Sequence, residues 1–123
     1  MMSKAFFLVE DEALIRMMLT DMIEELGHRV VAEAGTVDKA MMLAGSSAFD
    51  VAILDINLDG INIAPVADII SMRKIPFLFA SGYGSDGIPP AFSARPVLRK
   101  PFQIEELERI IKTLLSDSDE AVA

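Results

Sequence analysis

The sequence predicts an α/β fold in which helices cover both faces of a parallel sheet, and three observations support this prediction. The chain has 123 residues, which is the length of one domain and enough to bury a core. Short apolar runs of strand length alternate with segments whose apolar residues recur at helical spacing. Within the runs, apolar and polar residues do not alternate, which is typical of parallel strands buried on both faces.

Composition and charge exclude several classes of function. Hydrophobic residues make up 52% of the chain and charged residues 24%, a balance typical of globular proteins. The formal net charge of -8 argues against non-specific nucleic-acid binding and against an anionic membrane surface. Because there is no cysteine, disulfides, thiolate metal sites and cysteine nucleophiles are excluded. The N-terminal apolar run is too short for a signal peptide or a bilayer span, so we expect a cytoplasmic protein.

The first part of the chain predicts a strand, a helix and a second strand. Residues 6–9 form an apolar run of strand length. Over residues 13–26 the apolar side chains recur at helical spacing, and Gly27 stands where a helix C-cap belongs. The run at residues 29–34 is short and contains two adjacent valines, which favours a strand. His28, the single histidine, lies in the turn between helix and strand, and we expect it on the surface.

The middle of the chain predicts a third strand between two helices. Thr36 is a typical N-cap for a helix that reaches about residue 43. Residues 49–54 are the third apolar run. Pro65 suits the first turn of a helix that extends to Met72, because proline lacks the N–H that a first turn leaves unpaired.

The last part of the chain predicts two strands, an irregular connection and a clear helix. Residues 77–80 and 97–98 are the fourth and fifth apolar runs. The stretch 82–95 between them is rich in glycine and proline, so we expect a loop with at most a turn or two of helix. Residues 107–115 carry apolar side chains along one helical face, which predicts an amphipathic final helix.

Polar side chains follow four of the predicted strands and are expected to meet at one edge of the sheet. Glu10 and Asp11 follow the first strand, Asp55 the third, Ser81 the fourth and Lys100 the fifth. Open parallel sheets bind ligands at the carboxyl ends of their strands. Carboxylates can hold Mg²⁺ or act as nucleophiles, and a hydroxyl and an ammonium can stabilise phosphoryl oxygens. Each residue alone is more often a helix cap or a solvated side chain, but together they indicate phosphoryl chemistry.

Over nearly its whole length the chain resembles the receiver domains of two-component response regulators. Four segments carry the resemblance: LVEDE at 8–12, FDVAILDINLDG at 49–60, FASG at 79–82 and LRKPF at 98–102. It implies a flavodoxin-like, doubly wound five-stranded parallel sheet in the order 2-1-3-4-5, with about five helices, the fourth short or irregular. We therefore expect a receiver domain over residues 1–116 and a disordered acidic tail over residues 117–123.

The resemblance also implies a role for each strand-end residue. Asp55 corresponds to the phosphoacceptor aspartate. Glu10 and Asp11 correspond to the acidic pair that, with Asp55, holds Mg²⁺ or Mn²⁺. Ser81 corresponds to the hydroxyl that bonds the phosphoryl group, and Lys100 to the lysine that pairs with the phosphoryl oxygens.

Other residues of the four segments correspond to supporting positions of the family. Asn57 matches the position whose backbone carbonyl completes the metal shell. Gly60 matches the glycine that closes the loop after the phosphorylation site, and Gly82 follows Ser81 in its motif. Pro101 is expected to follow a cis peptide bond.

The chain departs from the family pattern in three respects. Val97 stands where the family usually has a switch aromatic, so the usual coupling of hydroxyl movement to an aromatic rotation cannot operate. Tyr83 is a candidate substitute or a loop aromatic packed for stability. The stretch from Ser81 to Lys100 is short and rich in glycine and proline, and resembles a subgroup of stand-alone receivers of alphaproteobacteria. Glu10 replaces the commoner aspartate.

The resemblance implies a signalling protein that is not an enzyme. It would take a phosphoryl group onto Asp55 from a histidine kinase or a histidine phosphotransfer protein, and then act on an unknown downstream protein, as a monomer or a phosphorylation-dependent dimer. One alternative is a binding module that signals without phosphorylation. Another is a phosphohydrolase of the haloacid-dehalogenase type, which needs an aspartate two residues after the nucleophile, where this chain has Asn57.

Overall fold

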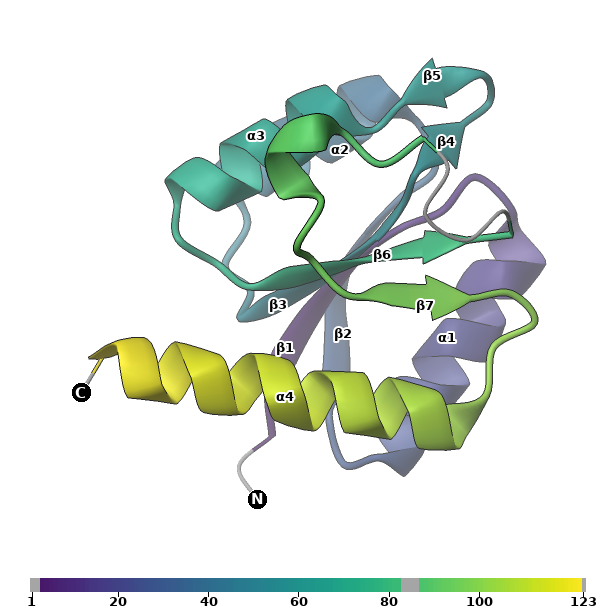
Figure 1. The fold of residues 1–123 in the computed structure, drawn as a ribbon. Coiled ribbons are helices and arrows are strands. Elements are labelled where there is room, and N and C mark those ends of the chain that lie inside the picture. Colours follow the sequence, from purple (N-terminus) through teal and green to yellow (C-terminus); the bar gives the residue numbers. More distant parts are fainter. Residues whose placement is uncertain (1–2, 83–86, 123) are drawn as a thin grey trace.

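A central parallel sheet with helices on both faces forms the molecule (Figure 1). The computed structural model describes residues 3–82 and 87–122, and the side chains of these ranges as far as residue 116. The strands are β1 (Ala5–Val9), β2 (Arg29–Ala34), β3 (Val51–Asp55), β4 (Asn57–Leu58), β5 (Ile61–Asn62), β6 (Phe77–Ser81) and β7 (Val97–Arg99). The helices are α1 (Ala13–Glu25), α2 (Val37–Ser46), α3 (Ala64–Met72), the 3-10 helix η1 (Pro90–Phe92) and α4 (Ile104–Val122).

The sheet confirms the predicted topology. Its strands are parallel and lie in the order β2-β1-β3-β6-β7. This is the predicted order 2-1-3-4-5, because β4 and β5 form a separate antiparallel hairpin. The hairpin itself was not predicted.

Two hydrophobic cores lie on the two faces of the sheet. Along β1, Phe6 and Leu8 point into the core that α1 and α4 cover, whereas Phe7 and Val9 point into the core under α2 and α3. Figure 1 shows these helix pairs on opposite sides of the sheet. Burial on both faces explains why β1, β3 and β6 are continuous apolar runs, whereas the edge strands β2 and β7 are partly exposed.

Local sequence signals determine where the first helices begin and end. Gly27 follows α1 with a φ of +92°, a left-handed conformation that favours glycine. The Thr36 hydroxyl accepts a hydrogen bond from the backbone N–H of Lys39 at 3.2 Å, and so caps α2 as predicted. Pro65 lies in the first turn of α3. The α2 helix ends at Ser46, slightly beyond the predicted residue 43.

The connection between β6 and β7 contains, in its described part, a single short helix, as predicted. Phe92 of η1 packs its ring edge-on against Phe77, with 5.4 Å between the ring centroids, and lies 6.5 Å from the ring of Phe79. The guanidinium of Arg95 lies over the Phe77 ring, 4.3 Å from its centroid. These contacts attach the connection to the α2 and α3 side of the sheet.

The backbone of α4 is helical as far as Val122, through most of the segment that the sequence pattern assigns to a tail. Residues 117–122 contain neither glycine nor proline, so nothing in their backbone stops the helix. The domain boundary at residue 116 stays a prediction. Within the described ranges, no helix combines the length and the apolar character that crossing a bilayer requires.

The expectation that His28 lies on the surface was wrong. Only 6% of the residue is exposed. Its Nδ1 accepts a hydrogen bond from the backbone N–H of Lys4 at 3.1 Å, and its ring lies 5.5 Å from that of Phe6. Burial, together with the charge of Lys4, holds the pKa of the imidazole below its usual value. The turn after α1 therefore packs against the start of β1.

Candidate functional site

An open cleft lies at the carboxyl ends of the strands. Parallel pairing places Asp55 beside Ala80, and Ser81 beside Arg99, so the residues that end β3, β6 and β7 share one edge of the sheet. The residues that line the cleft are Asp11, Glu12, Asp55, Ile56, Asn57, Asp59, Gly60, Asn62, Ser81, Gly82, Gly87 and Lys100. The structure thus brings the predicted strand-end residues together.

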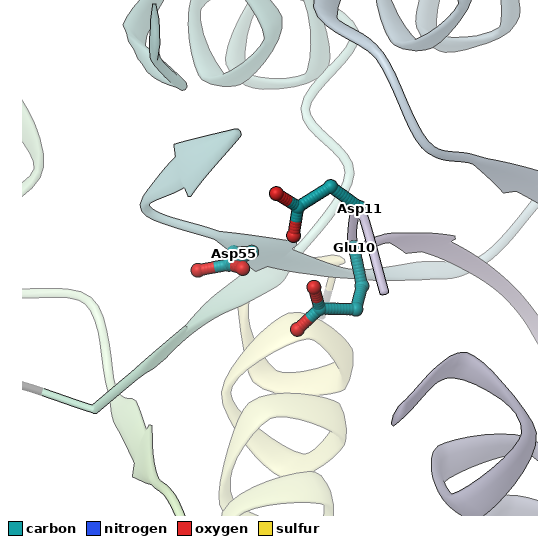
Figure 2. A group of neighbouring side chains, drawn as sticks. All are labelled: Glu10, Asp11 and Asp55. Carbon is teal, nitrogen blue, oxygen red and sulfur yellow. The ribbon is translucent and has the colours of Figure 1, made fainter. Parts of the chain in front are cut away.

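Three carboxylates form the acidic centre of this edge. Glu10 and Asp11 come from the end of β1 and Asp55 from the end of β3, as Figure 2 shows. Each offers an oxygen within 4.8 Å of the other two. Glu10 and Asp55 are buried, whereas Asp11 is exposed to solvent. Hard oxygen ligands at this spacing fit a divalent cation such as Mg²⁺, which would also relieve the repulsion between them.

Lys100 connects two of these carboxylates. Its Nζ lies 2.8 Å from Oε1 of Glu10 and 3.3 Å from Oδ2 of Asp55. Partial burial works against the charged ammonium, but the hydrogen bond to Glu10 and the charge of Asp55 outweigh it, so the pKa of Lys100 is raised. A cation therefore stays beside the Asp55 carboxylate.

The Glu10 carboxyl holds a proton more tightly than an ordinary glutamate. Burial, with the hydrogen bond to Asp11 as the next cause, raises the pKa of Glu10 to about 7. The same hydrogen bond lowers the pKa of Asp11. The backbone N–H of Glu12 and Lys100 act in the opposite direction, since both donate to the Glu10 carboxylate. In the metal-free protein Asp11 therefore gives up its proton more readily than Glu10.

The loop after Asp55 is arranged by backbone and side-chain hydrogen bonds. Asp59 and Gly60 both have positive φ, 49° and 85°, as a two-residue turn between β4 and β5 requires. The N–H of Gly60 donates to Oδ1 of Asn57 at 2.8 Å, and the N–H of Asp59 donates to Oδ2 of Asp11 at 3.2 Å. These contacts tie the loop to Asp11 of the acidic centre, and Asn57 is among the residues that line the cleft.

The ends of β6 and β7 hold most of the remaining predicted residues. Ser81 is buried at the end of β6, and its carbonyl accepts a hydrogen bond from the N–H of Lys100 at 3.0 Å. The peptide bond between Lys100 and Pro101 is cis. Val97 is half-buried and packs against the core under α2 and α3. Tyr83, the candidate switch residue, lies outside the described residues.

Two contributors to this edge were not identified from the sequence. The amide of Asn62 donates from Nδ2 to the carbonyl of Gly87 at 2.9 Å and accepts at Oδ1 from the N–H of Ala64 at 2.9 Å. Arg16 of α1 donates from Nη1 to the backbone carbonyl of Glu10. Neither residue directly follows a strand of the main sheet, so the rule that selected the other residues could not find them.

Comparison with known proteins agrees with this arrangement. The family model of the response regulator receiver domain matches residues 6–112. The transcriptional regulatory protein PdtaR of Mycobacterium tuberculosis is 35% identical, over 94% of this chain and 58% of its own length. The solution structure of SdrG from Sphingomonas melonis Fr1 is 39% identical, with a TM-score of 0.82, and the match covers 92% of this chain and 97% of SdrG.

A longer protein gives a similar structural match. The crystal structure of the anti-anti-sigma factor PhyR from Bartonella quintana has a TM-score of 0.85 at 28% identity, and the match covers 99% of this chain but 51% of PhyR. The chain therefore spans little more than half the length of PdtaR and PhyR. With the family model matched over residues 6–112 and the acidic cleft at the strand ends, the chain belongs to the response regulator receiver domains.

Proposed function

We propose that the chain accepts a phosphoryl group on Asp55 and passes the resulting signal to another protein by contact. The placement of Asp55 supports this proposal above all. Its carboxylate lies in the cleft, 3.3 Å from Nζ of Lys100 and grouped with the Glu10 and Asp11 carboxylates within 4.8 Å. A nucleophilic carboxylate, a fixed cation and a set of metal ligands are the groups that phosphoryl transfer requires.

The transfer would proceed by in-line displacement at phosphorus. An Asp55 oxygen forms the new O–P bond while the P–N bond of a phosphohistidine donor breaks, and the imidazole leaves with that electron pair. Lys100 stabilises the negative charge on the phosphoryl oxygens, and the Ser81 hydroxyl donates to one of them. Held by Glu10, Asp11, Asp55 and the backbone carbonyl of Asn57, Mg²⁺ or Mn²⁺ would neutralise further charge during the transfer.

A sensor histidine kinase or a histidine phosphotransfer protein is the proposed phosphodonor. The downstream protein would bind the surface formed by η1, β7 and α4. Two residues of the cleft connect to this surface, because Lys100 directly follows β7 and Ser81 pairs with Arg99 of β7. A dianionic group on Asp55 is a local change of charge that such a surface can report. Output through contact with a protein is in keeping with the net charge of -8, which disfavours nucleic-acid binding.

Intact-mass measurement after incubation with Mg²⁺ and acetyl phosphate tests the proposal. We expect a single phosphoryl adduct, which Asp55→Asn abolishes. Asp68→Asn is the matched control, because Asp68 is exposed on α3 away from the cleft, and it should keep the adduct. A chain that takes up no phosphoryl group, from the small donor or from a histidine kinase, would instead be a phosphorylation-independent binding module. Release of many phosphates per chain would indicate a phosphohydrolase.

A further inference from the structure

We infer that Arg16 is a positioning residue of the metal site, because its guanidinium fixes the peptide group that joins Glu10 to Asp11. This inference rests on the proposed function, since it concerns how tightly the acidic centre holds a divalent cation. Arg16 is not itself a ligand of the proposed metal site. It lies on α1 and contacts the backbone of Glu10. Its effect would reach the cation through the backbone.

The guanidinium of Arg16 makes two contacts that fix its orientation. Nη1 donates to the backbone carbonyl of Glu10, and Nε lies 3.4 Å from Oε1 of Glu33 on β2. The Arg16 side chain is 22% exposed, so most of it is enclosed by the protein. A guanidinium is planar and rigid, and contacts to two of its nitrogens therefore define its plane.

The peptide that Arg16 contacts connects the two neighbouring metal ligands. The carbonyl of Glu10 and the N–H of Asp11 belong to one planar group. On the preceding side, the N–H of Glu10 donates to the carbonyl of Ala34 at 3.0 Å. The backbone at Glu10 is thus held from β2 on one side and from α1 on the other. Rotation of this peptide would swing the Glu10 and Asp11 side chains relative to each other and separate their oxygens.

Gly35 leaves the space that the Arg16 guanidinium occupies. A Cβ atom at Gly35 would lie 3.0 Å from Nη1 of Arg16 and 3.8 Å from the carbonyl oxygen of Glu10. That first distance is tighter than a relaxed contact, so a methyl group there would push the guanidinium aside by a few tenths of an ångström. Gly35 directly follows β2, the strand that supplies Glu33 and Ala34. The missing side chain at the end of β2 therefore leaves room for the Arg16 guanidinium.

The ion pair between Arg16 and Glu33 does not by itself explain the arrangement. The Glu33 side chain is 47% exposed, and exposed ion pairs contribute little to stability. The contact with the Glu10 carbonyl, in contrast, acts on a residue that is 1% exposed and on the ligand next to it. Groups that orient metal ligands typically change metal affinity by about 10- to 100-fold when they are removed. Arg16 meets that description for this site.

Mg²⁺ titration of the whole chain by calorimetry tests the inference without requiring phosphorylation. We expect Arg16→Gln to weaken Mg²⁺ binding by about tenfold, with little change in the melting temperature of the metal-free protein. Arg16→Lys, which keeps one donor and the charge, should recover part of the affinity. Arg109→Gln is the control, because Arg109 is 70% exposed on α4, and it should bind Mg²⁺ like the wild type. Unchanged Mg²⁺ affinity in Arg16→Gln would overturn the inference.

A double-mutant cycle with Gly35→Ala separates positioning from a general loss of stability. Gly35→Ala should weaken Mg²⁺ binding when Arg16 is present, by less than Arg16→Gln does, and should have little further effect in Arg16→Gln, because the guanidinium that it shifts is then absent. Independent effects that simply add would contradict the inference. Should Arg16→Gln fail to fold, Arg16→Met, which keeps the apolar stem but has no donor, takes its place, and wild-type Mg²⁺ affinity in that variant refutes the role. If Asp55 takes up no phosphoryl group, the proposed function fails while these binding results still stand.

Discussion

The affinity of the acidic centre for Mg²⁺ should rise steeply between about pH 6 and pH 8, because Glu10 must release a proton before it can coordinate the ion. Burial raises the pKa of this carboxyl to about 7 in the metal-free protein. The neighbouring Asp11 and Lys100 do not change their protonation in this pH range. The pKa of Asp11 is lowered and that of Lys100 is raised, so both stay charged.

The size of the effect follows from the pKa. With a pKa of about 7, roughly a tenth of the Glu10 carboxyls are ionised at pH 6 and roughly nine tenths at pH 8. If Mg²⁺ requires the ionised form, its apparent dissociation constant should fall about tenfold between these two values. At about pH 7, binding should release roughly half a proton for each ion bound.

The same shift has a consequence for stability, and its sign can be worked out. The folded metal-free protein binds the Glu10 proton more tightly than the unfolded chain, whose carboxyl has the ordinary value of 4.5. This contribution to stability is fully present below pH 4.5 and is lost as the pH rises through about 7. Mg²⁺ should therefore raise the melting temperature more at about pH 8 than at about pH 6.

Calorimetric Mg²⁺ titrations at the two pH values, each in two buffers with different protonation enthalpies, measure both the affinity and the released proton. Glu10→Gln is the control, because an amide of the same size cannot titrate. This variant should bind Mg²⁺ more weakly, with nearly equal affinity at both pH values. Equal wild-type affinities at the two values, or a full tenfold change in Glu10→Gln, would refute the reasoning.

Two further predictions concern the helix cap and the buried histidine. Thr36→Ala removes the acceptor for the Lys39 N–H and should lower the free energy of unfolding by about 1 kcal/mol in urea denaturation; an unchanged midpoint would contradict the cap. Because burial lowers the pKa of His28, acid favours the unfolded chain, and the contribution of His28 to stability should fall from about pH 7 to pH 5. The difference in stability between the wild type and His28→Gln, which keeps an acceptor for Lys4, should therefore shift in favour of the variant over that range, and a constant difference would contradict this role of His28.

The strands and most helix limits could be predicted because they depend on short-range patterns. A strand buried on both faces must be apolar throughout, and the run that contains Phe6 and Phe7 shows this without any tertiary information. Thr36, Pro65 and Gly27 act on the backbone beside them, so their caps follow from local chemistry.

The β4–β5 hairpin and the burial of His28 were missed for different reasons. Asp59–Gly60 is a typical two-residue hairpin sequence, and it could have been noticed. Its flanking strands are only two residues each, too short for any hydrophobic period to appear. The burial of His28 depends on Lys4 and Phe6, which are distant in the chain, and no pattern around His28 reports them.

The chemical groups at the strand ends could be predicted from residue order alone, because a parallel sheet places the carboxyl ends of its strands along one edge. Which of these groups are in contact depends on the three-dimensional packing of the chain. Lys100 and Glu10 meet at 2.8 Å although 90 residues separate them, and Arg16 reaches the carbonyl of Glu10 from the next helix. Such pairings depend on how the strands and helices pack at distances of a few ångströms, whereas periodicity and residue type report only on the local backbone.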